Sequence, residues 1–270
     1  MFKKILSTAL AMAMVLSMAV STSAALGKPG SSTPSTKTEQ SSSSSKKSSS
    51  SSSSSKEYDL CKTQLAKDKL ALSMHNTFLS GLKANKDKIT VSIKGYTEKQ
   101  VYAAFQSSLQ MIFDEHPEIF WLDTMQNLVV SSDHKTLTFY PRPASGYGTA
   151  SKDGLTASKL NTTAIKNTTA KMNEAVKKMT GSTTYEQVKA IHDGIINKTQ
   201  YPANPDKATH NQHQAVGPLV EGKAVCDGYA KAFKYACDQK GIPCVIVVGN
   251  ATNNIGEKGT HAWNYVQVDG

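Results

Sequence analysis

The sequence lacks the long apolar run of a membrane-spanning chain and a cysteine that could carry a lipid near its start. Its N-terminal apolar stretch, Ile5 to Val20, is shorter than the roughly twenty residues that a spanning helix needs. Lys3 and Lys4 precede this stretch, and the small residues Thr22 to Ala24 follow it. This order is typical of a secretory signal, which predicts a leader over residues 1–25 with cleavage near Ala24, and a secreted or cell-wall-associated protein.

The part of the chain that can fold carries little net positive charge. The formal net charge is +10, but residues 1–56 hold seven lysines against one glutamate, a net charge of +6, which leaves +4 for the other residues. A nucleic-acid-binding surface usually combines a basic stripe with aromatic residues on a folded domain. The excess charge lies outside such a domain, so we predict no nucleic-acid partner.

Residues 26–56 have almost no side chains that could fill a core. They are mostly serine with lysine, threonine and proline, and they include the unbroken run Ser48 to Ser55. This composition predicts a disordered linker. Two interpretations of its lysines stay open, a solvated spacer and electrostatic contact with anionic polymers of a cell wall.

The sequence also lacks the paired ligands of a structural zinc site. Such sites usually place ligands two to four residues apart in pairs. Only His210 and His213 have that spacing, and no cysteine pair matches them. The zinc-capable residues considered are His210, His213, Cys226, Cys237, Cys244 and His261. We therefore predict neither a metal nor another cofactor.

Residues 57–180 are predicted to form a mainly helical region with one hairpin. Apolar spacing predicts a helix over Glu57–Lys88, a second from Thr97 to the stop at His116-Pro117, and a third over Leu155–Met179. Alternation over Gln126–Tyr140 predicts the hairpin. No internal repeat is present at any useful period.

From residue 181 the predicted elements change to a mixed helix and strand pattern. Tyr185–Lys198 reads as a helix, and Cys226–Lys240 as another that Gly241 caps. Strands are predicted over Cys244–Val248 and His261–Val268, with a polar loop over 250–259. We expect these residues to form the core that carries the chemistry.

Cys226 has three possible roles at the start of its predicted helix. Unpaired N–H groups and the helix dipole favour a thiolate there, and a thiolate nucleophile needs a base, for which His261 is the candidate. The first alternative is a buried structural cysteine. The second is a disulfide, which export permits, with Cys61 as the most obvious partner; Cys237 and Cys244 are predicted to lie in the core.

Two stretches of this region, GKAVCDGYAKAFKYACDQKGIPCVIVVG and GTHAWNYVQVDG, resemble the core of bacterial transglutaminase-like proteins. The resemblance covers roughly residues 185–270, and HPEIFWL at 116–122 is similar to a helical segment that accompanies this core in secreted members. It implies an α+β, papain-like fold, with a cysteine-bearing helix packed on an antiparallel sheet. It also implies that Cys226 is the nucleophile and His261 the base.

The same resemblance implies roles for residues around the cysteine. Tyr201 matches a tyrosine that helps to hold the oxyanion together with the Cys226 backbone N–H, and its alternative role is core packing. His213 matches a histidine that orders the loop before the cysteine. Trp263 and Tyr229 are expected in the core or in the pocket wall.

The third catalytic residue of the family is an aspartate on the next strand, in a motif like V-D-x-T-W. The sequence ends at Asp269-Gly270 before this motif. Asp269 is a poor substitute, since eight residues of extended strand put it about 26 Å from His261. We therefore expect an incomplete core, weak or no turnover, and a chain that is part of a longer protein.

The sequence thus predicts an exported cysteine enzyme that acts on amide or peptide bonds. Its substrate would be a protein or peptide at the cell envelope, and the outcome either transamidation or hydrolysis. The alternative is a non-catalytic adhesion or assembly module of the cell envelope that keeps the fold without the chemistry.

Overall fold

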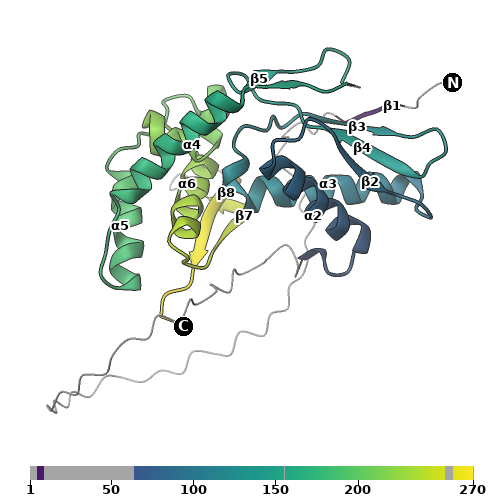
Figure 1. Cartoon of the computed structure of the whole chain (residues 1–270). Coiled ribbons are helices and arrows are strands. Elements are labelled where there is room, and N and C mark those ends of the chain that lie inside the picture. The colour runs from purple at the N-terminus through teal and green to yellow at the C-terminus, as the bar shows by residue number, and fades with distance from the viewer. Residues whose placement is uncertain (1–4, 9–63, 155, 253–257, 270) are drawn as a thin grey trace, which may run out of the picture. The chain divides into compact units, whose positions relative to one another are not determined.

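The computed structural model describes residues 5–8, 64–154, 156–252 and 258–269, which belong to one compact unit (Figure 1). Three features predicted from the sequence lie outside these residues: cleavage near Ala24, the linker over 26–56, and a disulfide through Cys61.

Two helices begin the described part of the main chain, α2 (Lys69–Lys83) and α3 (Glu98–Glu115). The predicted first helix is interrupted at residues 66–68, where the Asp68 side chain accepts the N–H of Ala71 and starts α2 at Lys69, and α2 ends five residues before the predicted Lys88. The predicted second helix is confirmed. It starts with a capping box between Thr97 and Gln100 and ends at His116.

An antiparallel sheet packs with these helices, in the strand order β1-β3-β4-β2. Its strands are β1 (Ile5–Thr8), β2 (Ile89–Ser92), β3 (Gln126–Val130) and β4 (Thr136–Tyr140). The hairpin predicted over residues 126–140 is confirmed as β3 and β4. Strand β2, whose four residues carry only two buried apolar side chains, was not predicted, and neither was β1, which falls within the predicted leader.

Two further helices follow, α4 (Thr162–Lys177) and α5 (Thr184–Ile196). The third predicted helix started too early, because residues 159–160 pair as strand β6 (Lys159–Leu160) with β5 (Gly148–Thr149) and because the Asn161 side chain caps α4. The predicted helix over 185–198 is confirmed as α5.

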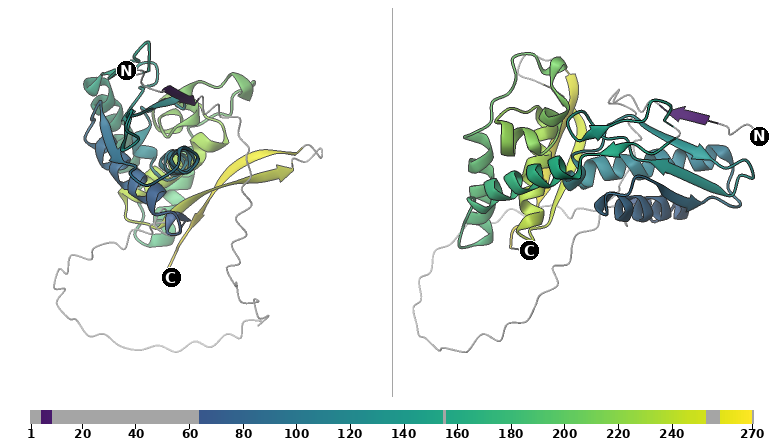
Figure 2. Two further views of the ribbon diagram at one scale, coloured as in Figure 1. Left: turned by 90° about the vertical axis from the view of Figure 1, so that its right-hand side faces the viewer. Right: turned by 45° about the horizontal axis from the view of Figure 1, so that its top comes forward.

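The C-terminal part consists of α6 (Cys226–Gln239) and an antiparallel ribbon of β7 (Cys244–Thr252) and β8 (Lys258–Val266). Gly241 has a φ of 68° just after α6, as a helix cap of this kind requires. Both strands are longer than predicted, so less of 250–259 is loop. Figure 2 shows the ribbon alongside α6, and an α+β fold with a cysteine-bearing helix on an antiparallel sheet is confirmed.

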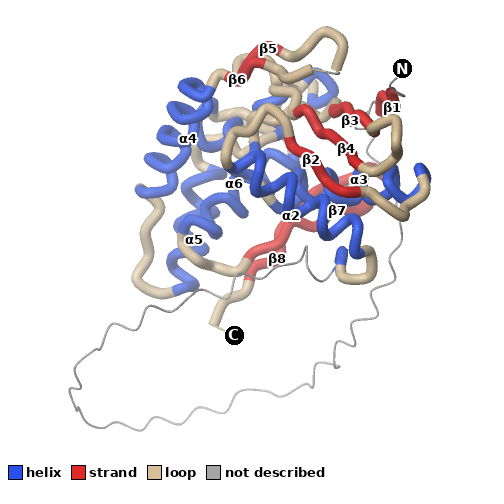
Figure 3. The backbone as a smooth tube through the Cα atoms, turned by 45° about the vertical axis from the view of Figure 1, so that its right-hand side comes forward, coloured by secondary structure: helices blue, strands red, loops and turns tan. Residues whose placement is uncertain are grey.

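Helix α6 is enclosed from several sides. It contacts β7 and β8, and also α4 and α5, which lie near it in Figure 3. Between α5 and α6 the chain forms only short turns of helix, among them η2 (Pro205–Lys207), η3 (His210–His213) and η4 (Gly217–Glu221). These turns place loop residues against the start of α6.

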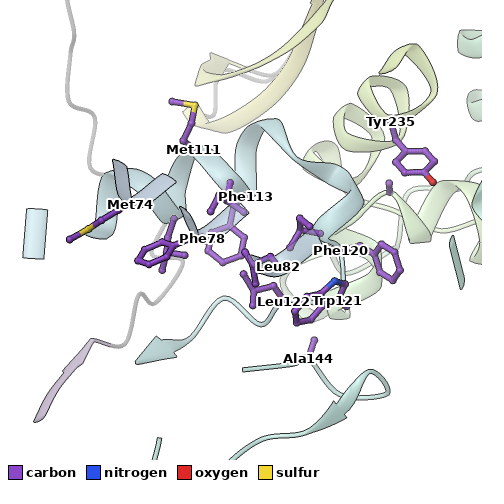
Figure 4. Packing of buried hydrophobic residues seen from close by; sticks show 14 of the residues in the cluster. Met74, Phe78, Leu82, Met111, Phe113, Phe120, Trp121, Leu122, Ala144 and Tyr235 are labelled. Carbon is purple, nitrogen blue, oxygen red and sulfur yellow. The ribbon is translucent and has the colours of Figure 1, made fainter. Parts of the chain in front are cut away.

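The hydrophobic core extends from α2 to α6. Phe78, Phe105 and Phe139 join α2, α3 and β4 with ring centroids 4.9–5.8 Å apart. The HPEIFWL segment contains a short 3-10 helix, η1 (Pro117–Ile119), and then buries Phe120, Trp121 and Leu122 in the core (Figure 4). This segment contacts α6, so it connects the N-terminal helices to the cysteine-bearing helix.

A buried ion pair also ties α3, α6 and β7 together. Lys234 Nζ lies 3.4 Å from Glu115 Oε2 and donates to the Cys244 carbonyl oxygen at 3.0 Å. Glu115 Oε1 accepts the N–H of Ile246 at 3.2 Å. Burial raises the pKa of Glu115 from 4.5 to about 7, an effect that the charge of Lys234 only partly offsets.

This shifted pKa predicts a pH-dependent stability. Between about pH 4.5 and pH 7 the folded chain binds a proton at Glu115 that the unfolded chain has released, so this group makes the free energy of unfolding fall as pH rises through that window. Glu115→Gln should flatten the decrease, whereas the exposed control Glu174→Gln should keep it. Urea denaturation at pH 5 and pH 8 measures the slope, and equal slopes in wild type and Glu115→Gln would contradict the assignment.

Candidate active site

Cys226 is the first residue of α6 and is partly exposed. The residue before it, Val225, is extended, with φ −98° and ψ 179°, and no side chain caps the helix at that position. The first hydrogen bond of the helix runs from the N–H of Tyr229 to the Val225 carbonyl oxygen at 3.1 Å. The thiol is therefore accessible and lies at the positive end of the helix dipole.

A short backbone pairing brings the segment after α5 to the cysteine. The Gln200 N–H donates to the Gly222 carbonyl oxygen at 3.0 Å, and the Ala224 N–H donates back to the Gln200 carbonyl oxygen at 3.2 Å. These bonds align residues 199–201 with residues 222–224, parallel to each other. Because Tyr201 follows Gln200, the pairing places it beside Cys226.

Tyr201 interacts with Cys226 and stays accessible. Burial raises the pKa of Tyr201, the nearby Cys226 charge raises it further, and the Cys226 backbone acts in the opposite direction. Tyr201 is 53% exposed. Its ring stacks on Tyr229 with centroids 6.4 Å apart and planes 13° apart, and the Tyr229 hydroxyl donates to the Thr199 carbonyl oxygen at 2.8 Å. Tyr229 thus forms part of the wall beside the thiol.

The η3 loop packs against the first turn of α6. The Val225 N–H donates to the Gln212 carbonyl oxygen at 3.2 Å. His213 Nδ1 lies 2.9 and 3.0 Å from the two carboxylate oxygens of Asp227, the residue after the cysteine. His213 therefore links its own loop to the start of α6.

A second histidine fixes the other end of this loop. His210 Nε2 lies 2.7 Å from the Phe120 carbonyl oxygen, and because a carbonyl only accepts, this ring nitrogen carries the proton. Burial lowers the pKa of His210, although the Phe120 carbonyl works against that effect. The loop before Cys226 is thereby tied to the HPEIFWL segment.

One buried lysine of α6, Lys231, was not predicted from the sequence. Lys231 is 3% exposed and donates to the His213 carbonyl oxygen at 3.0 Å. No role was predicted for this residue. The available signal was the small residues Ala230, Ala232 and Ala236 around it, which allow other elements to pack closely on several sides of the helix.

His261 lies on the face of the ribbon that is turned away from α6. Asn264 Nδ2 donates to the Ala230 carbonyl oxygen at 3.0 Å, and Ala262 packs with Ala230, so these two residues of β8 face α6. Since side chains alternate along a strand, His261 and Trp263 face away. Their rings stack with centroids 6.4 Å apart.

No hydrogen bond joins His261 to Cys226 within the described residues, and His261 as the base stays a prediction. A one-residue shift of β8 against β7 would exchange the faces of the strand and turn the imidazole toward the helix.

The remaining described cysteines lie in the core, as predicted. Cys237 and Cys244 are buried free thiols, and Cys226 is a free thiol as well. Contact with the Cys244 thiol, together with burial, raises the pKa of Cys237. These two thiols are poor nucleophiles. The part of the chain that the structure describes contains no group of three or more His, Cys, Asp or Glu residues that could hold a metal ion.

Comparison with known proteins finds one family model that matches part of the chain. Residues 172–270 are similar to the transglutaminase-like superfamily. The match begins within α4, a little before the boundary at residue 181 that the sequence predicted.

The similarity to solved structures is weak. One similar structure is a candidate cysteine protease from Cytophaga hutchinsonii, at 18% identity and a TM-score of 0.32, with 50% of each chain covered. Another is named a TGase, at 17% identity and a TM-score of 0.32, with 67% of this chain and 48% of that one covered. The chain thus spans about half the length of both. No curated protein matches its sequence. No helix in the described ranges has the length and apolar character needed to cross a membrane.

The close approach of α6 to the η3 loop makes Gly228 a test of the site. A Cβ there would lie 2.1 Å from the Gln212 carbonyl oxygen, whereas a Cβ at Gly259 would meet open space. Alanine in a helix interior normally gains about 1 kcal/mol over glycine, but the clash should reverse this. We expect Gly228→Ala to lower the free energy of unfolding in urea by about 1–3 kcal/mol. Gly259→Ala should change it little, and equal effects would contradict the packing.

Proposed function

We propose that this chain is an exported cysteine enzyme that forms a thioester with the carbonyl group of an amide or peptide bond. The accessible thiol of Cys226 at the uncapped start of α6, with Tyr201 beside it, is the observation that carries this proposal. The match of residues 172–270 to the transglutaminase-like family supports it.

The first step is attack by the Cys226 sulfur on the carbonyl carbon of a carboxamide or peptide group. A bond forms between sulfur and carbon, and the negative charge moves to the carbonyl oxygen. In our proposal the Cys226 N–H and the Tyr201 hydroxyl donate to that oxygen, and the interaction of Tyr201 with Cys226 supports this role. In our proposal His261 takes the thiol proton, which requires the imidazole to turn toward α6.

The second step breaks the carbon–nitrogen bond. The leaving amine or ammonia takes the proton from His261, and a thioester remains on Cys226. An amine then accepts the acyl group in transamidation, or water accepts it in hydrolysis. In the described residues no carboxylate hydrogen-bonds to the His261 ring, so we expect a slow reaction. The predicted export makes proteins or peptides of the cell envelope the natural substrates.

A single-turnover acylation tests the proposal without requiring fast turnover. The full chain, mixed with an excess of a p-nitrophenyl ester of a blocked amino acid, should release about one nitrophenolate per chain in a burst, which depends on the thiolate. Cys226→Ala should abolish the burst, and Cys61→Ser should keep it. No burst in wild type, or an equal burst in Cys226→Ala, would favour a non-catalytic adhesion or assembly module.

The same burst separates the roles of Tyr201 and His261. Tyr201→Phe keeps the ring beside Tyr229 but removes the donor, and loss of one oxyanion donor typically costs a factor of a hundred or more. His261→Gln should slow the burst at neutral pH by roughly a hundredfold or more because it removes the base. Tyr185→Phe, on an exposed tyrosine of α5, is the control. Unchanged burst rates in both variants would leave neither residue with its proposed role.

A further inference from the structure

The N-terminal sheet has an edge that holds an extended segment of polypeptide. Strand β3 pairs with β4 on one side and with β1 on the other, in antiparallel orientation, with Leu6 opposite Leu128 and Thr8 opposite Gln126 (Figure 1). Strand β1 belongs to residues 1–25, which the sequence predicts to be a removable leader. Removal of the leader would leave the edge of β3 without this strand.

The register of the sheet defines which backbone groups of β3 face that edge. The Ser131 N–H donates to the Thr136 carbonyl oxygen at 2.9 Å, so these two residues form a hydrogen-bonded pair at the end of the β3–β4 ladder. Such pairs alternate along an antiparallel ladder, and therefore Val129 is bonded to β4 as well. The N–H and C=O groups of Leu128 and Val130 consequently point away from β4, toward the edge that β1 occupies.

The side chains of Leu128 and Val130 lie on the face of the sheet that the helices cover. Leu128 is opposite Phe139, whose ring packs against Phe105 of α3 and Phe78 of α2. Directly opposite residues of an antiparallel pair share a face of the sheet. A strand on the edge of β3 therefore places every second side chain on this helix-covered face, beside Leu128 and Val130.

A pocket adjoins these positions on the same face. It lies between β3 and the first turn of α3, and its lining includes Ile93, Tyr96, Val101, Tyr102, Leu128 and Val130. The lining is mainly apolar with two tyrosine rings, which suits an apolar side chain. Tyr96 is 39% exposed, so the rim of the pocket is accessible from solvent.

The outer edge of β7 provides a comparison, because side chains close it. Lys234 Nζ donates to the Cys244 carbonyl oxygen at 3.0 Å, and the Glu115 carboxylate accepts the Ile246 N–H at 3.2 Å. These backbone groups are therefore already bonded and do not offer a free ladder to another strand. The edge of β3 instead carries a backbone partner, which indicates that it accepts a strand.

We propose that the edge of β3 is a docking site for an extended segment of a partner polypeptide that carries an apolar side chain opposite Leu128. Backbone hydrogen bonds to Leu128 and Val130 give the affinity, and the adjoining pocket gives the selectivity, as in other cases of strand addition. In the leader-bearing chain β1 fills this edge, so the leader blocks the site until it is removed. The proposal does not depend on the chemistry of Cys226.

A competition in the full chain tests the proposal. The probe is a fluorescent synthetic peptide with the sequence of residues 3–10, KKILSTAL, and its binding is followed by anisotropy. The double variant Leu6→Pro/Thr8→Pro removes the two β1 N–H groups that face β3 and should open the edge, so that the probe binds at least about tenfold more tightly than to wild type. Ser7→Pro is the matched control: the Ser7 N–H faces away from β3, so this variant should behave like wild type.

Two further measurements locate the bound peptide. Val130→Pro, added to the opened double variant, removes one N–H donor of the edge without touching the β4 ladder, and it should weaken probe binding by roughly tenfold. Hydrogen exchange of the Leu128 and Val130 amides, followed by NMR, should be slow in wild type, fast in the opened variant and slow again with the probe. The Val129 amide, which is bonded to β4, should stay slow throughout. The exchange readout remains valid even if Val130→Pro does not fold.

The outcomes are distinct. An opened variant that does not bind the probe, or binding that leaves exchange at Leu128 and Val130 unchanged, would overturn the docking site. Self-association of the opened variant that the probe does not reverse would assign the edge to a second copy of the chain and overturn the proposed occupant. None of these measurements involves Cys226, so the acylation burst tests the proposed function separately.

Discussion

The packing of the first turn of α6 against the backbone of the η3 loop is the constraint on which the rest of the site depends. The Gln212 carbonyl oxygen accepts the Val225 N–H and leaves room only for glycine at position 228. Since this contact fixes where α6 begins, it fixes the position of the Cys226 sulfur. The pairing of Gln200 with the segment before the helix then brings Tyr201 to the same place.

Helix α6 carries two buried lysines, which have different partners. Lys234 is matched by Glu115 and Asp238 and holds three elements together in the core. Lys231, three residues earlier, is also buried, and its ammonium donates to the His213 carbonyl oxygen in the η3 loop.

Sequence patterns predicted the elements whose signals are local. The helix start at Thr97, the hairpin at 126–140 and the start of α6 at Cys226 each depend on a few neighbouring residues. Helix lengths were overestimated where a cap such as Asp68 or Asn161 interrupted an apolar pattern that continues on both sides. Strand β2 was missed because its pairing partner lies far away in the sequence.

The site was predictable only in part, for the same reason. The motif around Cys226 indicates the family and the helix position, but burial of Lys231 depends on tertiary contacts that no spacing reveals. The face on which His261 lies depends on the register of β8 against β7, which a one-residue shift would reverse.

The central claim is that Cys226 is the reactive thiol of this fold, and a brief labelling experiment tests it most directly. The folded chain is exposed at pH 7 to less than one equivalent of iodoacetamide, and the modified cysteine is located by peptide mapping. The account predicts that Cys226 carries nearly all of the label, while Cys237 and Cys244 react only after unfolding. Label spread evenly over the cysteines, or a protected Cys226, would contradict it.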